Sequence, residues 1–260
     1  MSDDDSASIL DLQDVSVRLS GLQILDHVSI TVPRGHVVGV IGPNGAGKTT
    51  VFNVISGFVR PDSGTVTYDG RRQRRMKAHH LTRMGIARTL QGVGLFSSLT
   101  ALENVMQGGS GRIRSGILSQ SLAMPWTDIE EERLRVDALA VLDQLGIADQ
   151  ADRLPSELPY PIQKRVALGR ALISDPRLLL LDEPAGGVSA DDMADLAQVI
   201  RSWVPERSVL LVEHHMELVM GVCDLIWVLD AGRVIASGTP DEIRSDPAVL
   251  AAYLGEEGAA

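Results

Sequence analysis

Apolar and polar positions alternate near the start of the chain. "ILDLQDVSVRL" and "LQILDHVSITV" have this period of two on either side of Ser20-Gly21, which predicts a hairpin of half-buried strands. "HVVGVIG", "RLLLLDE" and "RSVLLVEHH" are almost wholly apolar, as strands buried on both faces are. "DLIWVLDAGRVIASG" predicts a second hairpin that turns at 230–232. Because these strands alternate with helical segments, we expect an α/β fold with a largely parallel sheet.

The middle of the chain has a different pattern. From about Thr100 to Arg170 the apolar positions follow a helical period, so this block interrupts a discontinuous α/β core. We expect a flexible acidic tail at 1–8 and a single domain at 9–260. Within that domain, 9–90 and 171–260 form the core, and about 91–170 form an inserted α-helical subdomain.

Composition narrows the range of functions. The 260 residues are 44% hydrophobic and carry a formal charge of −10, which disfavours a nucleic-acid partner. The basic run at 71–83 is therefore interpreted as a solvated face and not as an RNA or lipid site.

One cysteine excludes an internal disulfide. No apolar run approaches the roughly 20 residues of a membrane-spanning helix, and the acidic start lacks a signal peptide's apolar run. Membrane association would require a partner.

The clearest motif for chemistry is "GPNGAGKT", which fits G-x-x-x-x-G-K-[ST] between a predicted strand and a predicted helix. Its glycines let backbone N–H groups surround phosphates, and the helix N-terminus adds positive potential. We expect Lys48 to reach the β- and γ-phosphates and the Thr49 hydroxyl to ligate Mg²⁺. The predicted ATP-binding residues of this loop are Gly42, Pro43, Asn44, Gly45, Ala46, Gly47, Lys48, Thr49 and Thr50.

A second motif, "LLLLDEP", ends a buried strand in two carboxylates. Ligands of α/β proteins bind at this edge of the sheet. Asp182 is expected to hold the metal, and Glu183 to polarise the attacking water as the catalytic carboxylate. Together the two motifs predict a P-loop nucleotidase, and they do not separate transport ATPases from kinases or GTPases.

The order and spacing of "IGPNGAGKTT", "RTLQ", "LPYPIQKRVALGRAL", "LLLLDEPAGGVS" and "LLVEHH" resemble an ABC-type ATPase over nearly the whole chain. The resemblance implies an ABC ATPase core with an N-terminal antiparallel β subdomain. It implies that Gln91 senses Mg²⁺ and the transporter partner, and that His214 contacts the γ-phosphate. His215 stands where the family commonly has aspartate, which leaves open which histidine points inward.

Several positions depart from the family pattern. Leu19 stands where an aromatic residue usually stacks on adenine, so stacking is lost and an apolar contact remains. Ser189 occupies the D-loop position that is commonly Asp or Asn, and it is also the predicted N-cap of a helix. Pro161 is expected in the first turn of a helix, where proline is tolerated. The signature predicted to face the other subunit's ATP comprises Leu158, Pro159, Tyr160, Pro161, Ile162 and Gln163.

Pro159 and Pro161 change the chemistry of that signature. Pro159 removes a hydroxyl and Pro161 removes an N–H donor, whereas the helix dipole and Gln163 or Lys164 remain. Losing one charge-assisted hydrogen bond costs about 1.5–3 kcal/mol, or roughly ten- to a hundredfold.

"GIARTLQ", "VMGVCDLIWVLDAGRVIASGTPDEI" and "AYLG" resemble the larger ATP-binding subunit of branched-chain amino-acid importers. This resemblance implies ATP and Mg²⁺ as cofactors and a place on the cytoplasmic face of the cell membrane. It implies permease subunits, an extracytoplasmic solute-binding protein and a second ATPase subunit as partners, with a heterodimer favoured over a homodimer. The alternatives are the ATPase of a lipid-extracting exporter, a soluble ABC ATPase such as the iron–sulfur assembly type, and a non-hydrolysing regulatory protein.

Overall fold

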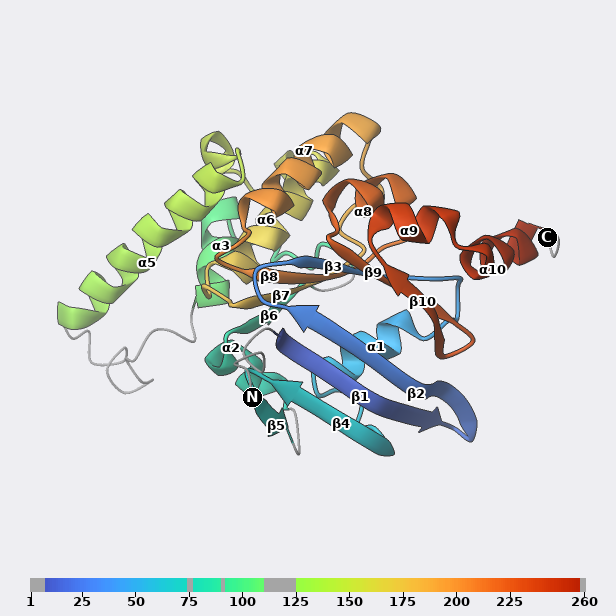
Figure 1. Cartoon of the computed structure of the whole chain (residues 1–260). Coiled ribbons are helices and arrows are strands. Elements are labelled where there is room, and N and C mark those ends of the chain that lie inside the picture. Colours follow the sequence, from blue (N-terminus) through green and yellow to red (C-terminus); the bar gives the residue numbers. More distant parts are fainter. Residues whose placement is uncertain (1–7, 74–76, 90–91, 110–124, 258–260) are drawn as a thin grey trace.

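Two β-sheets and helix α1 (Lys48–Ile55) between them form the base of the molecule in a computed structural model, which describes residues 8–73, 77–89, 92–109 and 125–257 (Figure 1). The first sheet has the strand order β2-β1-β4-β5, and the second has the order β10-β9-β3-β8-β7-β6. The strands are β1 (Ser8–Leu19), β2 (Leu22–Pro33), β3 (Val37–Ile41), β4 (Ser63–Tyr68), β5 (Arg71–Gln73), β6 (Ile86–Arg88), β7 (Leu178–Asp182), β8 (Ser208–Val212), β9 (Leu225–Asp230) and β10 (Arg233–Gly238).

The second sheet is parallel except at β10, which pairs antiparallel with β9. Every residue of β3, β7 and β8 is buried. Alternate side chains of these strands enter two different cores: Leu179 and Leu181 face one, and Leu178 and Leu180 face the other. The sheet therefore separates two hydrophobic layers, which explains why its strands are continuous apolar runs.

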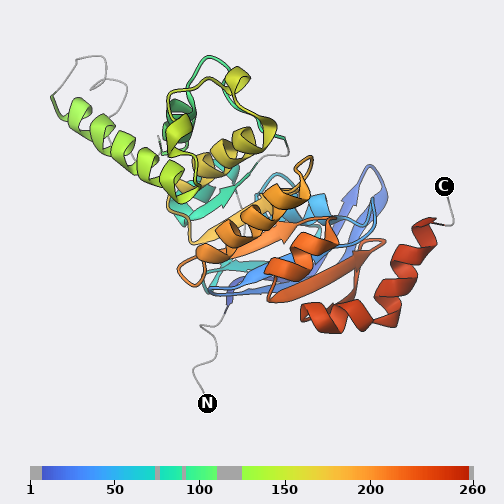
Figure 2. The ribbon, with the colours of Figure 1, turned by 90° about the horizontal axis from the view of Figure 1, so that it is seen from above.

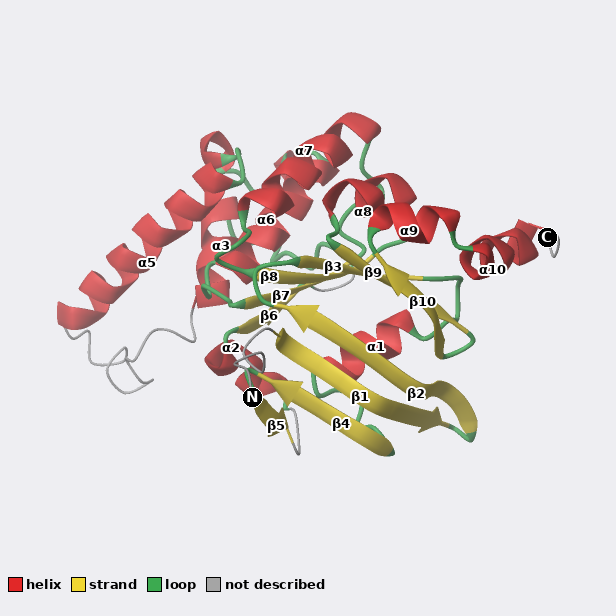
Figure 3. Ribbon diagram, viewed as in Figure 1, coloured by secondary structure: helices red, strands yellow, loops and turns green. Residues whose placement is uncertain are grey.

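Helices cover the sheet on the side opposite the β1–β2–β4–β5 sheet (Figure 3). They are α1 (Lys48–Ile55), α2 (Leu81–Met84), α3 (Ala101–Gly109), α5 (Pro125–Gln144), α6 (Tyr160–Leu172), α7 (Ala190–Ser202), α8 (Met216–Val222), α9 (Pro240–Ser245) and α10 (Pro247–Glu257). Helices α1 and α2 are the exceptions in this set, because Val51, Phe52 and Ile55 of α1 and Leu81 of α2 belong to the core that both sheets share. Seen from above, α5 and α10 project at opposite ends of the molecule (Figure 2).

Both predicted hairpins are confirmed. Strands β1 and β2 pair antiparallel around the turn at Ser20-Gly21, and β9 and β10 pair around 230–232. The predicted α/β class with an N-terminal antiparallel sheet and a largely parallel core sheet is confirmed as well. The predicted acidic tail lies outside the described residues except for Ser8, which begins β1. Within the described part of the chain, none of the helices is both long and apolar enough to cross a membrane.

Candidate active site

The ends of three buried strands bring the predicted site together. Strand β8 lies between β3 and β7, and its Val212 is the register partner of both Val40 and Asp182. Because neighbouring strands lie about 4.8 Å apart, the ends of β3 and β7 are separated by about 10 Å at the same level of the sheet. The loop after β3 leads into Lys48, the first residue of α1; β7 ends in Asp182, and the loop after β8 begins with Glu213.

The phosphate loop depends on two tight glycines. At Gly42, φ is 146°, and a Cβ there would lie 1.9 Å from the Leu229 carbonyl oxygen. Gly47 is the left-handed N-cap of α1 with φ 102°, and a Cβ there would lie 2.7 Å from a Leu25 methyl carbon. Only glycine fits such a combination of positive φ and close approach. The loop therefore turns directly from the strand into the N-terminus of α1, as a phosphate cradle requires.

Lys48 is folded back into this loop. Its Nζ donates to the carbonyl oxygens of Gly42 at 2.6 Å and Pro43 at 2.8 Å, and the residue is buried. Phosphate oxygens that enter the loop would replace these carbonyls as acceptors for the ammonium group. Thr49 in the first turn of α1 is exposed, so its hydroxyl is accessible at the mouth of the loop.

Asp182 and Glu183 differ in their surroundings although they are neighbours. The Asp182 side chain is 3% exposed, and its Oδ2 accepts from Arg88 Nη2 at 2.8 Å. Glu183 is half-buried and has φ 49°, a left-handed conformation that is rare outside glycine. Its backbone N–H donates to the Val212 carbonyl at 2.9 Å, which fixes the turn after β7. Such strained backbone is common at functional sites.

Glu213 organises the loop that carries the two histidines. Its carboxylate is fully buried and accepts from the backbone N–H groups of Ala185 at 2.9 Å, His214 at 2.7 Å and His215 at 3.0 Å. It also contacts His215 Nδ1 at 2.9 Å. Burial, the largest influence, raises the pKa of Glu213, but the hydrogen bonds from His215, Ala185 and His214 together outweigh it and hold the pKa below its ordinary value.

The two histidines are held differently by this carboxylate. The His215 ring lies within hydrogen-bond distance of Glu213, whereas His214 Nδ1 lies 3.4 Å away and its side chain is 55% exposed. His215 is thus tied to the protein interior, and His214 keeps its ring accessible beside it. This geometry supports His214 as the histidine that would reach a phosphate.

The predicted signature begins helix α6. Pro159 is its N-cap and Pro161 lies in its first turn, which confirms that proline here is compatible with a helix start. The two polar side chains that follow have partners within the chain. Gln163 Nε2 donates to the Leu158 carbonyl at 2.9 Å, and Lys164 Nζ donates to the carbonyls of Glu183 and Pro184, both at 3.1 Å. Burial lowers the pKa of Lys164 despite the nearby carboxylates Glu213 and Glu183.

The remaining predicted residues have simpler environments. Leu19 ends β1 and is 43% exposed, so it is accessible for an apolar contact. Ser189 is confirmed as the N-cap of α7, where its Oγ accepts from the Asp192 N–H at 3.2 Å. Gln91 lies outside the described residues.

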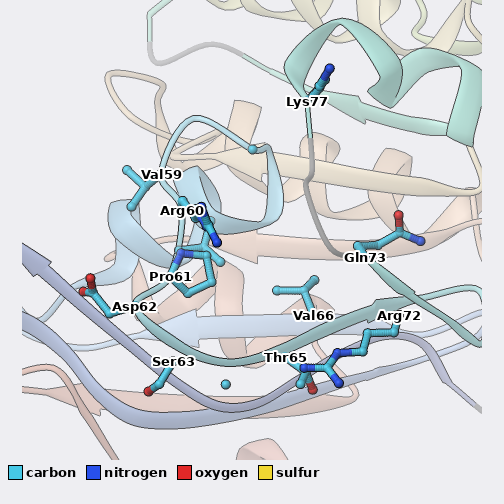
Figure 4. Close-up of a pocket in the computed structure, with 13 residues that line it drawn as sticks. Val59, Arg60, Pro61, Asp62, Ser63, Thr65, Val66, Arg72, Gln73 and Lys77 are labelled. Carbon is cyan, nitrogen blue, oxygen red and sulfur yellow. The ribbon is translucent and has the colours of Figure 1, made fainter.

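A hollow of about 880 Å³ lies away from these residues, between the turn after α1 and strands β4 and β5 (Figure 4). Arg60, Arg72 and Lys77 are among the residues that line it, and none of the predicted site residues does. Arg71, Arg72 and Lys77 of the basic run are exposed, as a solvated face would be.

Three further residues contact the site, and the sequence patterns did not predict these contacts. Arg88 binds Asp182, Glu213 supports the histidine loop, and Lys164 binds the carbonyl of Glu183. Arg88 and Glu213 lie inside segments that resemble family motifs. In the sequence, each is a charged residue at the end of an apolar strand, and that position was the only sign that it could belong to the site.

Two protein-family models match the chain. The model described as ABC transporter matches residues 25–186, and the model described as branched-chain amino acid ATP-binding cassette transporter matches residues 233–259. The chain is 36% identical over 253 residues to the high-affinity branched-chain amino acid transport ATP-binding protein LivG of Salmonella typhimurium, a match that covers 96% of this chain and 99% of LivG. It is 31% identical over 252 residues to the lipopolysaccharide export system ATP-binding protein LptB of Haemophilus influenzae, covering 96% of this chain and 98% of LptB.

The fold also matches a solved structure. A crystal structure of the ADP conformation of an ATP-binding cassette of an ABC transporter superposes with a TM-score of 0.83 at 31% sequence identity, covering 95% of this chain and 99% of that one. Because the match extends over nearly all of both chains, the architecture described above is similar to that ATP-binding cassette from end to end of the match.

The environment of Lys48 predicts the effect of its removal. Lys48→Ala eliminates the ammonium group that the loop encloses, so nucleotide affinity should fall by about a hundredfold or more, the loss of one or two charge-assisted hydrogen bonds. Isothermal titration with ATP in EDTA and in Mg²⁺ measures this change. Lys77→Ala, which removes an exposed lysine outside the loop, is the matched control. Equal affinity in the Lys48→Ala and Lys77→Ala variants would contradict the assignment of the loop.

The buried carboxylate of Glu213 predicts a pH-dependent loss of stability. Glu213→Gln replaces one carboxylate oxygen, which only accepts, with an NH₂ group that faces the backbone N–H donors of the loop. The free energy of unfolding should therefore fall by about 2–4 kcal/mol at pH 7. Because the folded-state pKa of Glu213 lies below its ordinary value, its stabilisation is present above that ordinary value and is lost as pH falls through the folded pKa.

Urea unfolding of wild type and Glu213→Gln from pH 7 to pH 3 tests this, and the difference should shrink toward the acid end. Glu217→Gln, at an exposed glutamate in α8, is the control and should match wild type throughout. A Glu213→Gln effect that does not depend on pH would show that the charge of Glu213 is not what the loop needs.

Proposed function

The chain belongs to the ABC transporter family of ATP-binding proteins and hydrolyses ATP for transport, and we propose that it powers the import of branched-chain amino acids or a similar small polar solute. The observation that carries the proposal is the family-model match at 233–259. The described part of that range, 233–257, contains β10, α9 and α10, which lie outside the phosphate loop and the strand ends that hold the predicted catalytic residues. The match therefore bears on the class of transporter and not on ATP hydrolysis as such. The chain is also more similar in sequence to LivG than to LptB, which supports the branched-chain amino-acid class of transporter over the exporter class.

The residues at the sheet edge fit the chemistry of Mg²⁺-dependent ATP hydrolysis. The Asp182 carboxylate and the Thr49 hydroxyl are oxygen donors of the kind that Mg²⁺ prefers, and when bound the ion neutralises charge on the phosphates. Lys48 would hold the β- and γ-phosphates, and Glu183 would orient the attacking water. His214, kept accessible beside the Glu213-bound His215, would contact the γ-phosphate. Gln91 would sense the ion and the partner, and Leu19 would contact the adenine.

The proposal includes an assembly, because solute selection requires other subunits. The chain would work at the cytoplasmic face of the cell membrane as a peripheral subunit. Its partners would be permease subunits, an extracytoplasmic solute-binding protein and a second ATPase chain, with the signature from Leu158 to Gln163 facing that chain's ATP. The different chemistry of this signature supports a heterodimer.

Reconstitution tests the transport function. The chain is purified with the permeases that copurify with it, placed in proteoliposomes, and assayed for ATP hydrolysis with a solute-binding protein loaded with leucine, isoleucine or valine. Stimulation of hydrolysis and uptake of the amino acid are the expected results. Hydrolysis that responds to lipopolysaccharide or phospholipid and not to amino acids would contradict import and favour an exporter.

Glu183 is the proposed catalytic carboxylate, which predicts a separation of binding from turnover. Glu183→Gln keeps the size of the side chain and removes the base, so hydrolysis by the assembled complex should fall by about a hundredfold or more while ATP still binds. ATP affinity and single-turnover hydrolysis are measured side by side. Glu206→Gln, at an exposed glutamate outside the site, is the control. Full turnover in Glu183→Gln would show that another group activates the water.

The prolines of the signature predict asymmetric ATPase sites. The isolated chain should bind ATP but hydrolyse it slowly, and the second ATPase chain should restore turnover. Pro161→Gly restores an N–H donor and should raise the isolated chain's rate by at most about ten- to a hundredfold. Greater backbone freedom of glycine reduces the gain.

Pro240→Gly makes the same change in the first turn of α9 and controls for that freedom. Steady-state hydrolysis by the three purified proteins is the measurement. A brisk wild-type rate that Pro161→Gly leaves unchanged would contradict the asymmetry.

A further inference from the structure

Arg88 forms an ion pair with the carboxylate that is expected to hold the metal ion. It is the last residue of β6, and its Nη2 donates to Asp182 Oδ2 at 2.8 Å. The two side chains are 12% and 3% exposed, so water screens the pair little. Strands β6 and β7 lie side by side, and Arg88 is the register partner of Leu180, two residues before Asp182 (Figure 1). The pair therefore joins the ends of neighbouring strands at the same edge of the sheet as the phosphate loop.

The rest of the Arg88 side chain is fixed by helix α1, the helix that follows the phosphate loop. Its Nη1 donates to Asn53 Oδ1 at 2.9 Å and to Ser56 Oγ at 3.1 Å. Its guanidinium carbon lies 5.4 Å from the Phe52 ring centroid and 5.9 Å from that of Phe58, within range of cation–π attraction. These contacts hold the guanidinium against Asp182 in one position.

Stability alone is a weak reason for this arrangement. A buried ion pair often stabilises a fold no more than apolar side chains of the same volume would. Arg88 Nε is moreover buried without a hydrogen-bond partner in the described part of the chain, which is unfavourable. Asp182, however, must remain a buried carboxylate if it is to serve the metal site. In the nucleotide-free protein that charge needs a cation, and Arg88 supplies it.

We propose that Arg88 is a positioning residue that neutralises Asp182 in the absence of nucleotide and competes with the metal ion for this carboxylate. The proposal rests on the proposed function, because it concerns the same metal site. Its consequence is that Asp182 offers little net charge to a divalent ion until phosphates are also present. Arg88 thereby limits the gain in nucleotide affinity that Mg²⁺ provides.

Removing the charge should move two affinities in opposite directions. Without Arg88, the negative charge of Asp182 is uncompensated in EDTA and repels the phosphates, so ADP binds less tightly. With Mg²⁺ present, the same carboxylate is available to the ion without competition from Arg88, so ADP binds more tightly. The ratio of the ADP dissociation constant in EDTA to that in Mg²⁺ should therefore rise in Arg88→Gln by about tenfold or more, the equivalent of one charge-assisted hydrogen bond.

The experiment measures ADP binding to the purified full chain by isothermal titration in EDTA and in saturating Mg²⁺. Arg83→Gln, which removes an exposed arginine from α2, is the matched control and should leave the ratio unchanged. Arg88→Lys keeps the charge but loses the planar fork, so the ratio should rise by a smaller factor, about threefold. In the Arg88→Gln/Asp182→Asn double variant the increase should disappear, because no carboxylate is left to respond.

A second readout does not involve nucleotide. The melting temperature of Arg88→Gln in EDTA should fall below that of wild type and Arg83→Gln, and Mn²⁺ or Mg²⁺ alone should recover part of the loss. If Arg88→Gln does not fold in EDTA, two other results test the proposal. They are recovery of the fold when the ion is added, and the ratio of ADP dissociation constants in Arg88→Lys. A purely structural role predicts destabilisation that divalent ions do not relieve and an unchanged ADP ratio in Arg88→Lys, and that result would overturn the proposal.

These outcomes can be distinguished from failure of the proposed function. Wild-type protein that binds no ADP in Mg²⁺ would remove the nucleotide site, and with it the basis for any role of Arg88. Normal ADP binding with an unchanged ratio in the Arg88 variants would overturn the Arg88 proposal alone. The transported solute affects neither measurement.

Discussion

Burial of β3, β7 and β8 on both faces is the constraint on which the site depends. Side chains within these strands must be apolar because each one enters one of the two cores, so polar chemistry is possible only where the strands end. The common register partner Val212 sets those ends level with one another. Lys48, Asp182 and Glu213 thus reach one edge although they are far apart in the sequence. An apolar sheet with aligned ends is what turns three separate loops into one site.

Charges at such an edge are only partly in water, and the two buried carboxylates each have a partner from another element. Glu213 accepts three backbone N–H groups, one of which comes from the loop after β7. Asp182 has the guanidinium of Arg88. The first carboxylate couples the loops after β7 and β8, and the second couples β6, β7 and α1. Both contacts are charged and buried, so removing one partner leaves the other unsatisfied in a setting where that is costly.

The sequence predicts those parts of the site whose chemistry needs adjacent residues. A phosphate loop requires its glycines and lysine at fixed spacing, so the spacing alone locates Gly42 to Thr49, and Asp182 and Glu183 follow from a strand that ends in two carboxylates. The Arg88–Asp182 pair is separated by 94 residues and depends on strand order, which no local pattern contains. The choice between His214 and His215 likewise needs the position of Glu213. In the sequence, Lys164 is only a side-chain donor that remains beside the signature, and its bonds to the Glu183 and Pro184 carbonyls could be found only from the packing of α6.

Helix α6 makes the signature and the catalytic loop parts of one unit. Lys164 donates to the carbonyls of Glu183 and Pro184, and a Cβ on Gly187 would lie 3.0 Å from the Tyr160 ring. The Lys164 ammonium also lies 5.6 Å from the centroid of that ring. The start of α6 therefore supports the turn in which Glu183 adopts its left-handed conformation. Pro159 and Pro161 fix φ on both sides of Tyr160 and stiffen this support, even as Pro161 removes a donor from the surface proposed to face the second ATPase chain. The two prolines thus act on two surfaces: the turn that carries Glu183 within this chain, and the start of α6 that is proposed to face the second ATPase chain.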